Sequence, residues 1–285
     1  MPSMTFRWRR TVFPATALVL AASVGLIPLS ASGADAARPE HATTKPTIVL
    51  VHGAFADAGS WAPEVTRLHD LGYTVYAPAN PLRSLSGDAA YIKSFLQTID
   101  GPVVLVGHSY GGAVITEAAA GLDNVKALVY VAAFALDKGE SAATVLPADK
   151  YPGSLLTPDK LVVRDYPDSS APGGTNADLY INPGDFRSIF ANDNSSAGAT
   201  ELALTQRPLS QSAFGEPLGV QPAWKTIPTW DLVTLDDHAI SPAGQKFMAA
   251  RAHAKTTTIR AAHDVSLTRP DAVDKIIIDA ATSNR

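Results

Sequence analysis

Short runs of apolar, often β-branched residues alternate with stretches of helical pattern along most of the chain. Runs with little polar alternation are typical of strands that are covered on both faces. In the first half of the chain, four such strands are predicted, over residues 47–51, 73–77, 103–106 and 125–131. Helices are predicted after the first three of them, over residues 60–70, 88–98 and 111–120. This alternation indicates an α/β fold with a mostly parallel, doubly wound sheet.

The alternation stops near Phe134 and resumes near Ile227. After the gap we expect a strand, a helix, a strand and a helix, over residues 227–234, 242–254, 256–260 and 270–281. An insertion within such a sheet is most simply a cap over the carboxyl ends of the strands, where these folds bind ligands. We therefore predict a helical cap at about residues 135–225, after the fourth strand. A separate domain is the alternative, but the segment has no strong core pattern of its own.

The N-terminal segment has the order of a secretory signal peptide. Three arginines within the first ten residues precede an apolar run over residues 12–29, and small residues follow. Among these, Ala34-Asp35-Ala36 fits the A-x-A cleavage pattern. The sequence therefore predicts a signal peptide over residues 1–36 and a secreted domain over residues 37–285.

A transmembrane anchor is the alternative for the same apolar run. Pro14 and Pro28 bracket the run, and the stretch between them is short for crossing a bilayer. We therefore expect no membrane anchor after cleavage. Arg9 and Arg10 resemble the pair of a twin-arginine signal, so the Sec and twin-arginine routes both stay open.

Composition and charge narrow the classes of function. The chain is 46% hydrophobic and 18% charged, which is typical of a folded globular protein and excludes collagen-like and disordered classes. The net charge is -4 and no basic stripe is present, so a nucleic-acid partner is not expected. The absence of cysteine excludes disulfides, thiolate metal sites and a cysteine nucleophile.

One pentapeptide carries the strongest chemical signal. Gly107-His108-Ser109-Tyr110-Gly111 follows a predicted buried strand and opens a predicted helix, the context in which G-x-S-x-G forms a nucleophile elbow. The turn is so tight that the residues two positions before and after the serine must lack side chains. The helix N-terminus favours a developing negative charge. A chance match is the alternative, but the context predicts Ser109 as the nucleophile.

A serine hydroxyl needs a base to remove its proton, and in this type of fold the order along the chain is Ser, acid, His. His238, His253 and His263 follow the predicted elbow and the cap. His263 comes directly after the last predicted strand, where the base belongs, whereas His253 falls at a helix end. We predict His263 as the base.

The orienting acid belongs after the preceding strand, which is predicted to end at Thr234. Asp236 and Asp237 both qualify, and Asp237 is preferred because it lies in the loop just before the helix that opens at Pro242. Asp236-Asp237-His238 could suggest a metal site. Three adjacent residues do not easily converge on one ion, and no second group of ligands is evident, so no metal is predicted.

Ester chemistry also needs donors for the oxygen that becomes negative. One backbone N–H is expected from Tyr110, the residue after the nucleophile. The other is expected from Ala54, in the loop after the first strand. A simple glycine turn at Gly53 is the alternative.

These residues together resemble the α/β-hydrolase superfamily. Five segments resemble more narrowly the bacterial esterases related to plant methyl-ester esterases and hydroxynitrile lyases: residues 50–55, 102–112, 129–135, 206–209 and 222–228. The resemblance implies a Ser-Asp-His triad, no cofactor and a small helical cap. Together with the predicted signal peptide, these features predict a secreted carboxylesterase that cleaves a small-molecule ester through an acyl-enzyme.

Two positions depart from the lyases of this group. Those lyases have Lys directly after the catalytic His, where this chain has Asp264, and Glu before the nucleophile, where it has His108. Both departures favour ester hydrolysis. A hydroxynitrile lyase remains the alternative enzyme, and a small-molecule binding protein without turnover is the alternative from another class.

Overall fold

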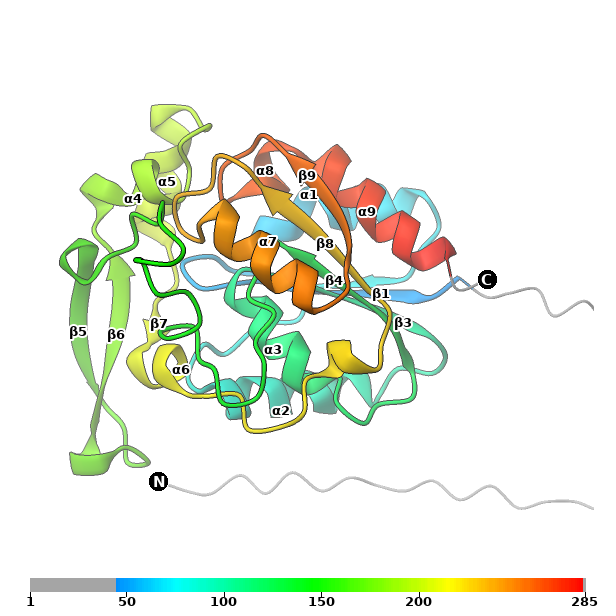
Figure 1. Ribbon diagram of the computed structural model, residues 1–285, viewed down its shortest axis with the longest axis horizontal. Helices are drawn as coiled ribbons and strands as arrows, with labels where there is room; N and C mark the ends of the chain where they lie inside the picture. The colour runs from blue at the N-terminus through cyan, green and yellow to red at the C-terminus, as the bar shows by residue number, and fades with distance from the viewer. Residues whose placement is uncertain (1–44, 284–285) are drawn as a thin grey trace, which may run out of the picture. The chain divides into compact units, whose positions relative to one another are not determined.

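A parallel sheet of six strands forms the centre of the fold, with strand order β2-β1-β3-β4-β8-β9 (Figure 1). The strands are β1 (Thr47–Val51), β2 (Val75–Tyr76), β3 (Val103–His108), β4 (Val125–Val131), β8 (Thr229–Thr234) and β9 (Lys255–Ile259). The computed structural model describes residues 45–283, so the predicted signal peptide lies outside the described residues. Every neighbouring pair in this sheet is parallel, which confirms the predicted architecture.

Helices cover both faces of the sheet. One face packs against α1 (Ala62–Asp70), α8 (Val265–Thr268) and α9 (Pro270–Thr282), and the other against α2 (Leu85–Leu96), α3 (Tyr110–Ala118) and α7 (Pro242–Arg251). Short 3-10 turns lie at η1 (Ala58–Trp61), η2 (Pro158–Lys160), η3 (Pro172–Gly174) and η4 (Ala223–Lys225). Because both faces are covered, the inner strands lack polar alternation. None of the helices within residues 45–283 combines the length and the hydropathy that a bilayer-spanning helix requires.

The strand order reverses between β1 and β3, and this reversal positions the site. From β1 the chain runs outward to the edge strand β2 and then returns to β3 on the other side of β1. Loops after β1 and β3 therefore leave the same edge of the sheet side by side. Sheets of this kind bind ligands at such a switch point. Ala54 and Ser109, the first residues of interest, lie in these two loops.

The insertion after the fourth strand contains helices, as predicted, and also a small sheet that was not predicted. The residues between β4 and β8, here called the cap, contain α4 (Pro183–Ile189), α5 (Ser196–Thr205) and α6 (Gln211–Gly215). They also contain an antiparallel sheet of β5 (Leu161–Pro167), β6 (Thr175–Ile181) and β7 (Leu209–Ser210). Much of β5 is exposed, and its mixture of apolar and charged residues hid the strand pattern.

Two boundaries also differ from the prediction, for local reasons. The first predicted helix begins at Ala62, because the Asp57 side chain accepts from Gly59 N and starts η1 instead. The last predicted strand, β9, begins one residue earlier than expected, at Lys255, and is an edge strand with four exposed residues. Its β-branched threonines still favour the extended backbone.

Glu64 on α1 is a buried carboxyl group without a hydrogen-bond partner. Its side chain is fully buried, and neither carboxylate oxygen has a partner among the described residues. Burial, with a smaller contribution from Asp274, raises the pKa of Glu64 from 4.5 to about 8. Between these values the folded chain binds a proton that the unfolded chain has lost. The contribution of Glu64 to stability is therefore present at low pH and is lost as the pH rises.

We expect Glu64→Gln to make stability less dependent on pH. In the wild type, this group alone should lower the free energy of unfolding by up to about 1.4 kcal/mol for each pH unit between its two pKa values. Urea unfolding at pH 5 and pH 8.5 measures the change, with the exposed Glu201→Gln as the matched control. Equal losses of stability in Glu64→Gln and wild type would contradict the prediction.

Candidate active site

Ser109 lies on a strained turn between β3 and α3. Its backbone angles are φ 52° and ψ -124°, a left-handed conformation that L side chains rarely adopt. A side chain at Gly107 would come within 2.6 Å of the Gly111 carbonyl oxygen, and one at Gly111 would collide with the carbonyl of Val51. The turn therefore requires glycine at both predicted positions, and it lifts Ser109 above the carboxyl edge of the sheet.

The structure brings Ser109, His263 and Asp237 together from three separate loops. His263 Nε2 lies 2.8 Å from Ser109 Oγ, and His263 Nδ1 lies 2.7 Å from Asp237 Oδ2. The imidazole and the carboxylate are both buried. The carboxylate accepts from Nδ1–H, so Nε2 carries the lone pair and accepts from the serine hydroxyl. This arrangement can remove the Ser109 proton during attack.

Asp237 is fully buried and its two oxygens are saturated with donors. Oδ1 accepts from the backbone N–H groups of Ala239 and Ile240, each at 2.8 Å. Oδ2 accepts from Thr234 Oγ1 at 2.9 Å and Gln245 Nε2 at 2.8 Å, besides His263. These donors compensate the buried negative charge and hold the carboxylate in one orientation. Sequence reasoning missed Thr234 and Gln245, because nothing in their local pattern marks them.

Asp236 and His238, on either side of Asp237, bond to other partners than His263. Of the two candidate acids, Asp237 is therefore the one that contacts His263. Asp236 forms an ion pair with Arg260 at 2.8 Å, and His238 Nδ1 lies 2.8 Å from the backbone oxygen of Ser188. The cluster Asp236-Asp237-His238 therefore diverges instead of converging on an ion. Among residues 45–283, no group of three His, Asp or Glu side chains is arranged to hold a metal.

Ala54 and Tyr110 lie beside Ser109, as predicted for the two backbone donors. Both line the same cavity as Ser109 and His263. Tyr110 is the first residue of α3, so its N–H has no acceptor within the helix. In the part of the chain that the structure describes, the Ala54 N–H is not used in a hydrogen bond. Both groups are therefore free to bind a developing oxyanion.

His52 holds the loop that carries Ala54. Its Nε2 accepts from Asn80 N at 2.9 Å, so Nδ1 carries the proton and donates to Gly53 O at 2.9 Å. Asn80 Nδ2 also donates to His52 O at 3.0 Å. Burial lowers the pKa of His52 to about 4, so the ring is neutral at physiological pH. His52 therefore acts in the structure of the loop.

The cavity above Ser109 is almost entirely apolar. It measures about 210 Å³ and lies between the sheet edge and the cap. Its apolar lining comes from both parts: Phe55, Phe134, Ala142, Ala143, Leu156, Pro158, Leu161, Leu179, Phe190, Leu209, Phe214, Ala239 and Ile240. No Asp, Glu, Lys or Arg side chain of the described residues lines it. The cavity therefore suits an uncharged, apolar group.

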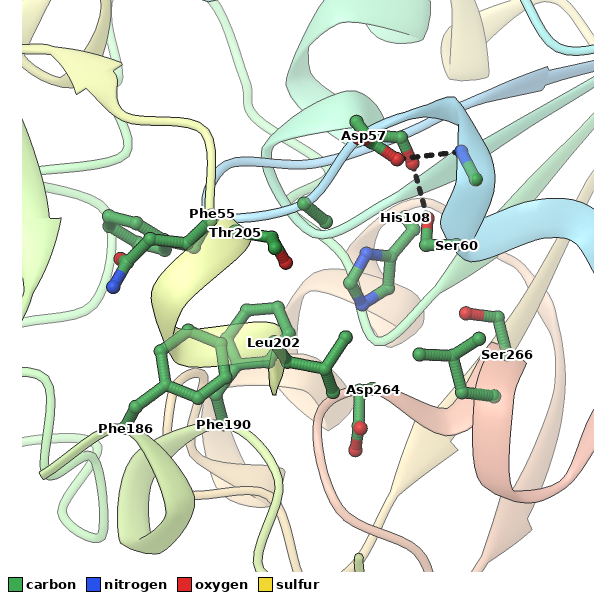
Figure 2. Close-up of a pocket in the computed structure, with 14 residues that line it drawn as sticks. Phe55, Asp57, Ser60, His108, Phe186, Phe190, Leu202, Thr205, Asp264 and Ser266 are labelled. Carbon is green, nitrogen blue, oxygen red and sulfur yellow. Dashed lines mark hydrogen bonds between the residues drawn. The ribbon is translucent and has the colours of Figure 1, made fainter. Parts of the chain in front are cut away.

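A smaller hollow of about 140 Å³ lies next to this cavity and shares Phe55 and Phe190 with it. Figure 2 shows the His108 ring between Phe190 and Leu202 on one side and Ser60 and Ser266 on the other. His108 is buried, and its Nε2 donates to the backbone oxygen of His263 at 2.8 Å. Burial lowers the pKa of His108 to about 3. His108 therefore supports the His263 loop as a neutral group.

Asp264 faces this smaller hollow instead of the cavity above Ser109 (Figure 2). Its carboxylate accepts a hydrogen bond from the Asn194 side chain of the cap. Burial, assisted by the charge of Asp193, raises the pKa of Asp264 to about 7. The position after His263 therefore supplies no cation to the cavity above Ser109.

Comparison with known proteins agrees with this architecture. A sequence profile described as the alpha/beta hydrolase family matches residues 48–276. The alpha/beta hydrolase nvfD of Aspergillus novofumigatus is 29% identical over 266 residues, which cover 83% of this chain and 97% of that protein. The carbendazim hydrolyzing esterase of Nocardioides is 32% identical over 112 residues, which cover 35% of this chain and only 46% of that esterase.

Solved structures share the fold at lower identity. An extracellular alpha/beta-hydrolase from Paenibacillus, described as homologous in structure and function to tobacco salicylic acid binding protein 2, superposes with a TM-score of 0.66. It is 23% identical, and the match covers 84% of this chain and 100% of that one. The profile match spans most of the chain and includes the elbow and His263. The chain therefore belongs to the alpha/beta hydrolase family.

Proposed function

We propose that this hydrolase is a serine carboxylesterase that works through an acyl-enzyme. The observation that carries the proposal is the 2.8 Å distance between His263 Nε2 and Ser109 Oγ, with Asp237 bonded to the opposite ring nitrogen. Esterases among the relatives support ester hydrolysis as the reaction. Because the triad selects acyl transfer and not a particular leaving group, the cavity must select the substrate.

The reaction follows from the positions of these groups. Ser109 Oγ bonds to the ester carbonyl carbon while His263 takes its proton, and the N–H groups of Ala54 and Tyr110 hold the oxyanion. The bond from carbon to the alcohol oxygen then breaks, and His263 gives the proton to the departing alcohol. Water attacks the acyl-enzyme with His263 again as base, which releases the acid and restores Ser109.

Release of nitrophenol from short nitrophenyl esters tests this function against the two alternatives. An esterase hydrolyses the esters and loses this activity in Ser109→Ala. A hydroxynitrile lyase would instead release cyanide from a cyanohydrin. A binding protein would retain a ligand without turnover of either compound.

We also propose that the chain is secreted, as its N-terminal segment predicts. The supporting observations are the three arginines, the apolar run and the cleavage pattern that ends at Ala36. N-terminal sequencing of the protein from culture medium tests the proposal, with Ala37 as the expected first residue. An intact Met1 in the cell pellet alone would contradict it.

The apolar cavity predicts a preference among acyl chains, and a larger side chain in the cavity should change that preference. Ala142 lines the cavity in the segment that follows β4. In Ala142→Phe we expect kcat/KM for an octanoyl ester to fall about tenfold or more, with little change for an acetyl ester, because a filled pocket excludes methylene groups. Leu204→Phe, at an exposed site on α5, is the control. Equal effects on both esters would show that the acyl chain binds elsewhere.

A further inference from the structure

We propose that one short cap segment, Arg207–Ser210, positions both oxyanion donors with the help of Arg83 and Asp88. The position of the cap on the rest of the fold then determines the rate of acyl transfer as well as the binding of substrate. This inference rests on the proposed function, since it assigns positioning residues to the same reaction. Two separate chains of contacts, one to each donor, support it.

The first chain of contacts leads to Ala54. Phe55, the next residue, donates its N–H to the carbonyl oxygen of Arg207 at 2.9 Å. Phe55 has φ 61°, a left-handed angle that a bulky residue adopts only when its surroundings impose it. Gln206 fixes the other end of this contact, because its side chain bonds to both N and O of Ile181 in β6 at 2.9 Å each. The loop of the first donor is therefore anchored to the cap.

The second chain of contacts leads to Tyr110. The Tyr110 hydroxyl donates to Asp88 Oδ2 at 2.9 Å, and both side chains are buried. Asp88 Oδ1 accepts from the backbone N–H of Arg83 at 3.1 Å. The position of the first residue of α3 is therefore linked to the loop that carries Arg83.

Arg83 connects that loop to the same part of the cap. Its guanidinium donates to Asp178 Oδ1 of β6 at 2.7 Å and to Pro208 O at 3.3 Å. It also lies 5.0 Å from the centre of the Tyr166 ring in β5. Alongside, Ser210 N donates to Leu82 O at 3.0 Å. The two chains of contacts thus converge on four consecutive residues of the cap.

The cap residues on which these contacts converge lie at the wall of the cavity above Ser109. Asp178 pairs with Ser210, and Leu179 pairs with Leu209, in the β6-β7 ladder. Leu179 and Leu209 line the cavity above Ser109. An acyl group that packs on these leucines therefore presses on the strands that hold both donors. Binding energy from a remote part of the substrate can in this way serve the transition state.

A merely structural role for Arg83 would affect Tm, whereas a positioning role affects kcat. The Arg83 side chain is 41% exposed, and ion pairs at such sites contribute little to stability. Loss of the guanidinium should therefore leave the fold intact. Its effect on the oxyanion donors should appear in kcat, because these donors act mainly in the transition state.

The test compares Arg83→Met, Asp178→Asn and the double variant with wild type on a butyryl nitrophenyl ester. We expect each single variant to lower kcat about tenfold, with KM within about twofold and Tm nearly unchanged. The double variant should be no slower than Arg83→Met, because both changes break one link. Arg83→Lys should recover part of kcat. Arg187→Met on α4, an exposed arginine elsewhere in the cap, is the matched control.

Inhibition gives a second measurement that a structural role would not change. A trifluoromethyl ketone forms an oxyanion with Ser109, so its inhibition constant should rise by the same factor as kcat falls. A rise in KM alone, or a normal kcat in both single variants, would overturn the inference while wild type still turns over. Absence of turnover in wild type would instead refute the proposed function, and this inference with it.

Discussion

Ser109→Ala is expected to lower kcat for ester hydrolysis by about 10⁵-fold or more. The rate that remains is the one that substrate binding and the oxyanion donors give without the nucleophile. The reason is that, among residues 45–283, Ser109 Oγ is the hydroxyl bonded to His263 Nε2. His263→Ala should cost a similar factor. The double variant should lose little more, because nucleophile and base act as one unit.

Steady-state release of nitrophenol, corrected for spontaneous hydrolysis, measures these losses. Ser266→Ala is the matched control, because Ser266 is also buried and lines only the neighbouring hollow. Its kcat should stay within about twofold of wild type, as for residues that do not touch reacting atoms. Ser109→Ala with a tenth of the wild-type kcat would contradict the proposed mechanism.

Asp237→Asn is expected to lower kcat by about 10⁴-fold with little change in KM. An amide at this position can donate to Nδ1, which would place the imidazole proton on Nε2 and remove the base from Ser109. The other contacts of Asp237, to Thr234, Gln245 and two backbone N–H groups, should keep the loop in place. Circular dichroism and Tm check that the variant folds.

Asp236→Asn provides the matched comparison at the adjacent position. It removes only the surface ion pair with Arg260, whose side chain is 79% exposed. Its kcat should therefore stay within about twofold of wild type. A larger loss in Asp236→Asn than in Asp237→Asn would reverse the assignment of the acid.

The local sequence was sufficient where one short segment determines the structure. Buried β-branched runs such as Thr47–Val51 identified the inner strands, because both faces of a parallel sheet exclude polar residues. The elbow was evident because its strained serine needs Gly107 and Gly111. The order Ser, acid, His then identified His263 among the histidines, and geometry places it beside Ser109.

Features that depend on distant residues could not be predicted. The hydrogen bonds of Gln245 and His52 join segments that only the folded chain brings together. In the cap sheet, β5 was missed because it is largely exposed and mixes apolar with charged residues. β6 does alternate, with Ala177, Leu179 and Ile181 buried, but it is a single short strand among turn residues and was not recognised. The tie between Phe55 and Arg207 is a contact between backbone groups, on which side-chain identity has little influence.

Covalent trapping of the serine tests the central claim most directly. Wild type and His263→Ala would be treated with a fluorophosphonate, and the modified residue identified by mass spectrometry of the digested protein. Our account predicts one adduct per chain, on Ser109, formed together with complete loss of esterase activity, and much slower labelling in His263→Ala. Loss of activity with the adduct on any other residue, or full activity after Ser109 is modified, would contradict it.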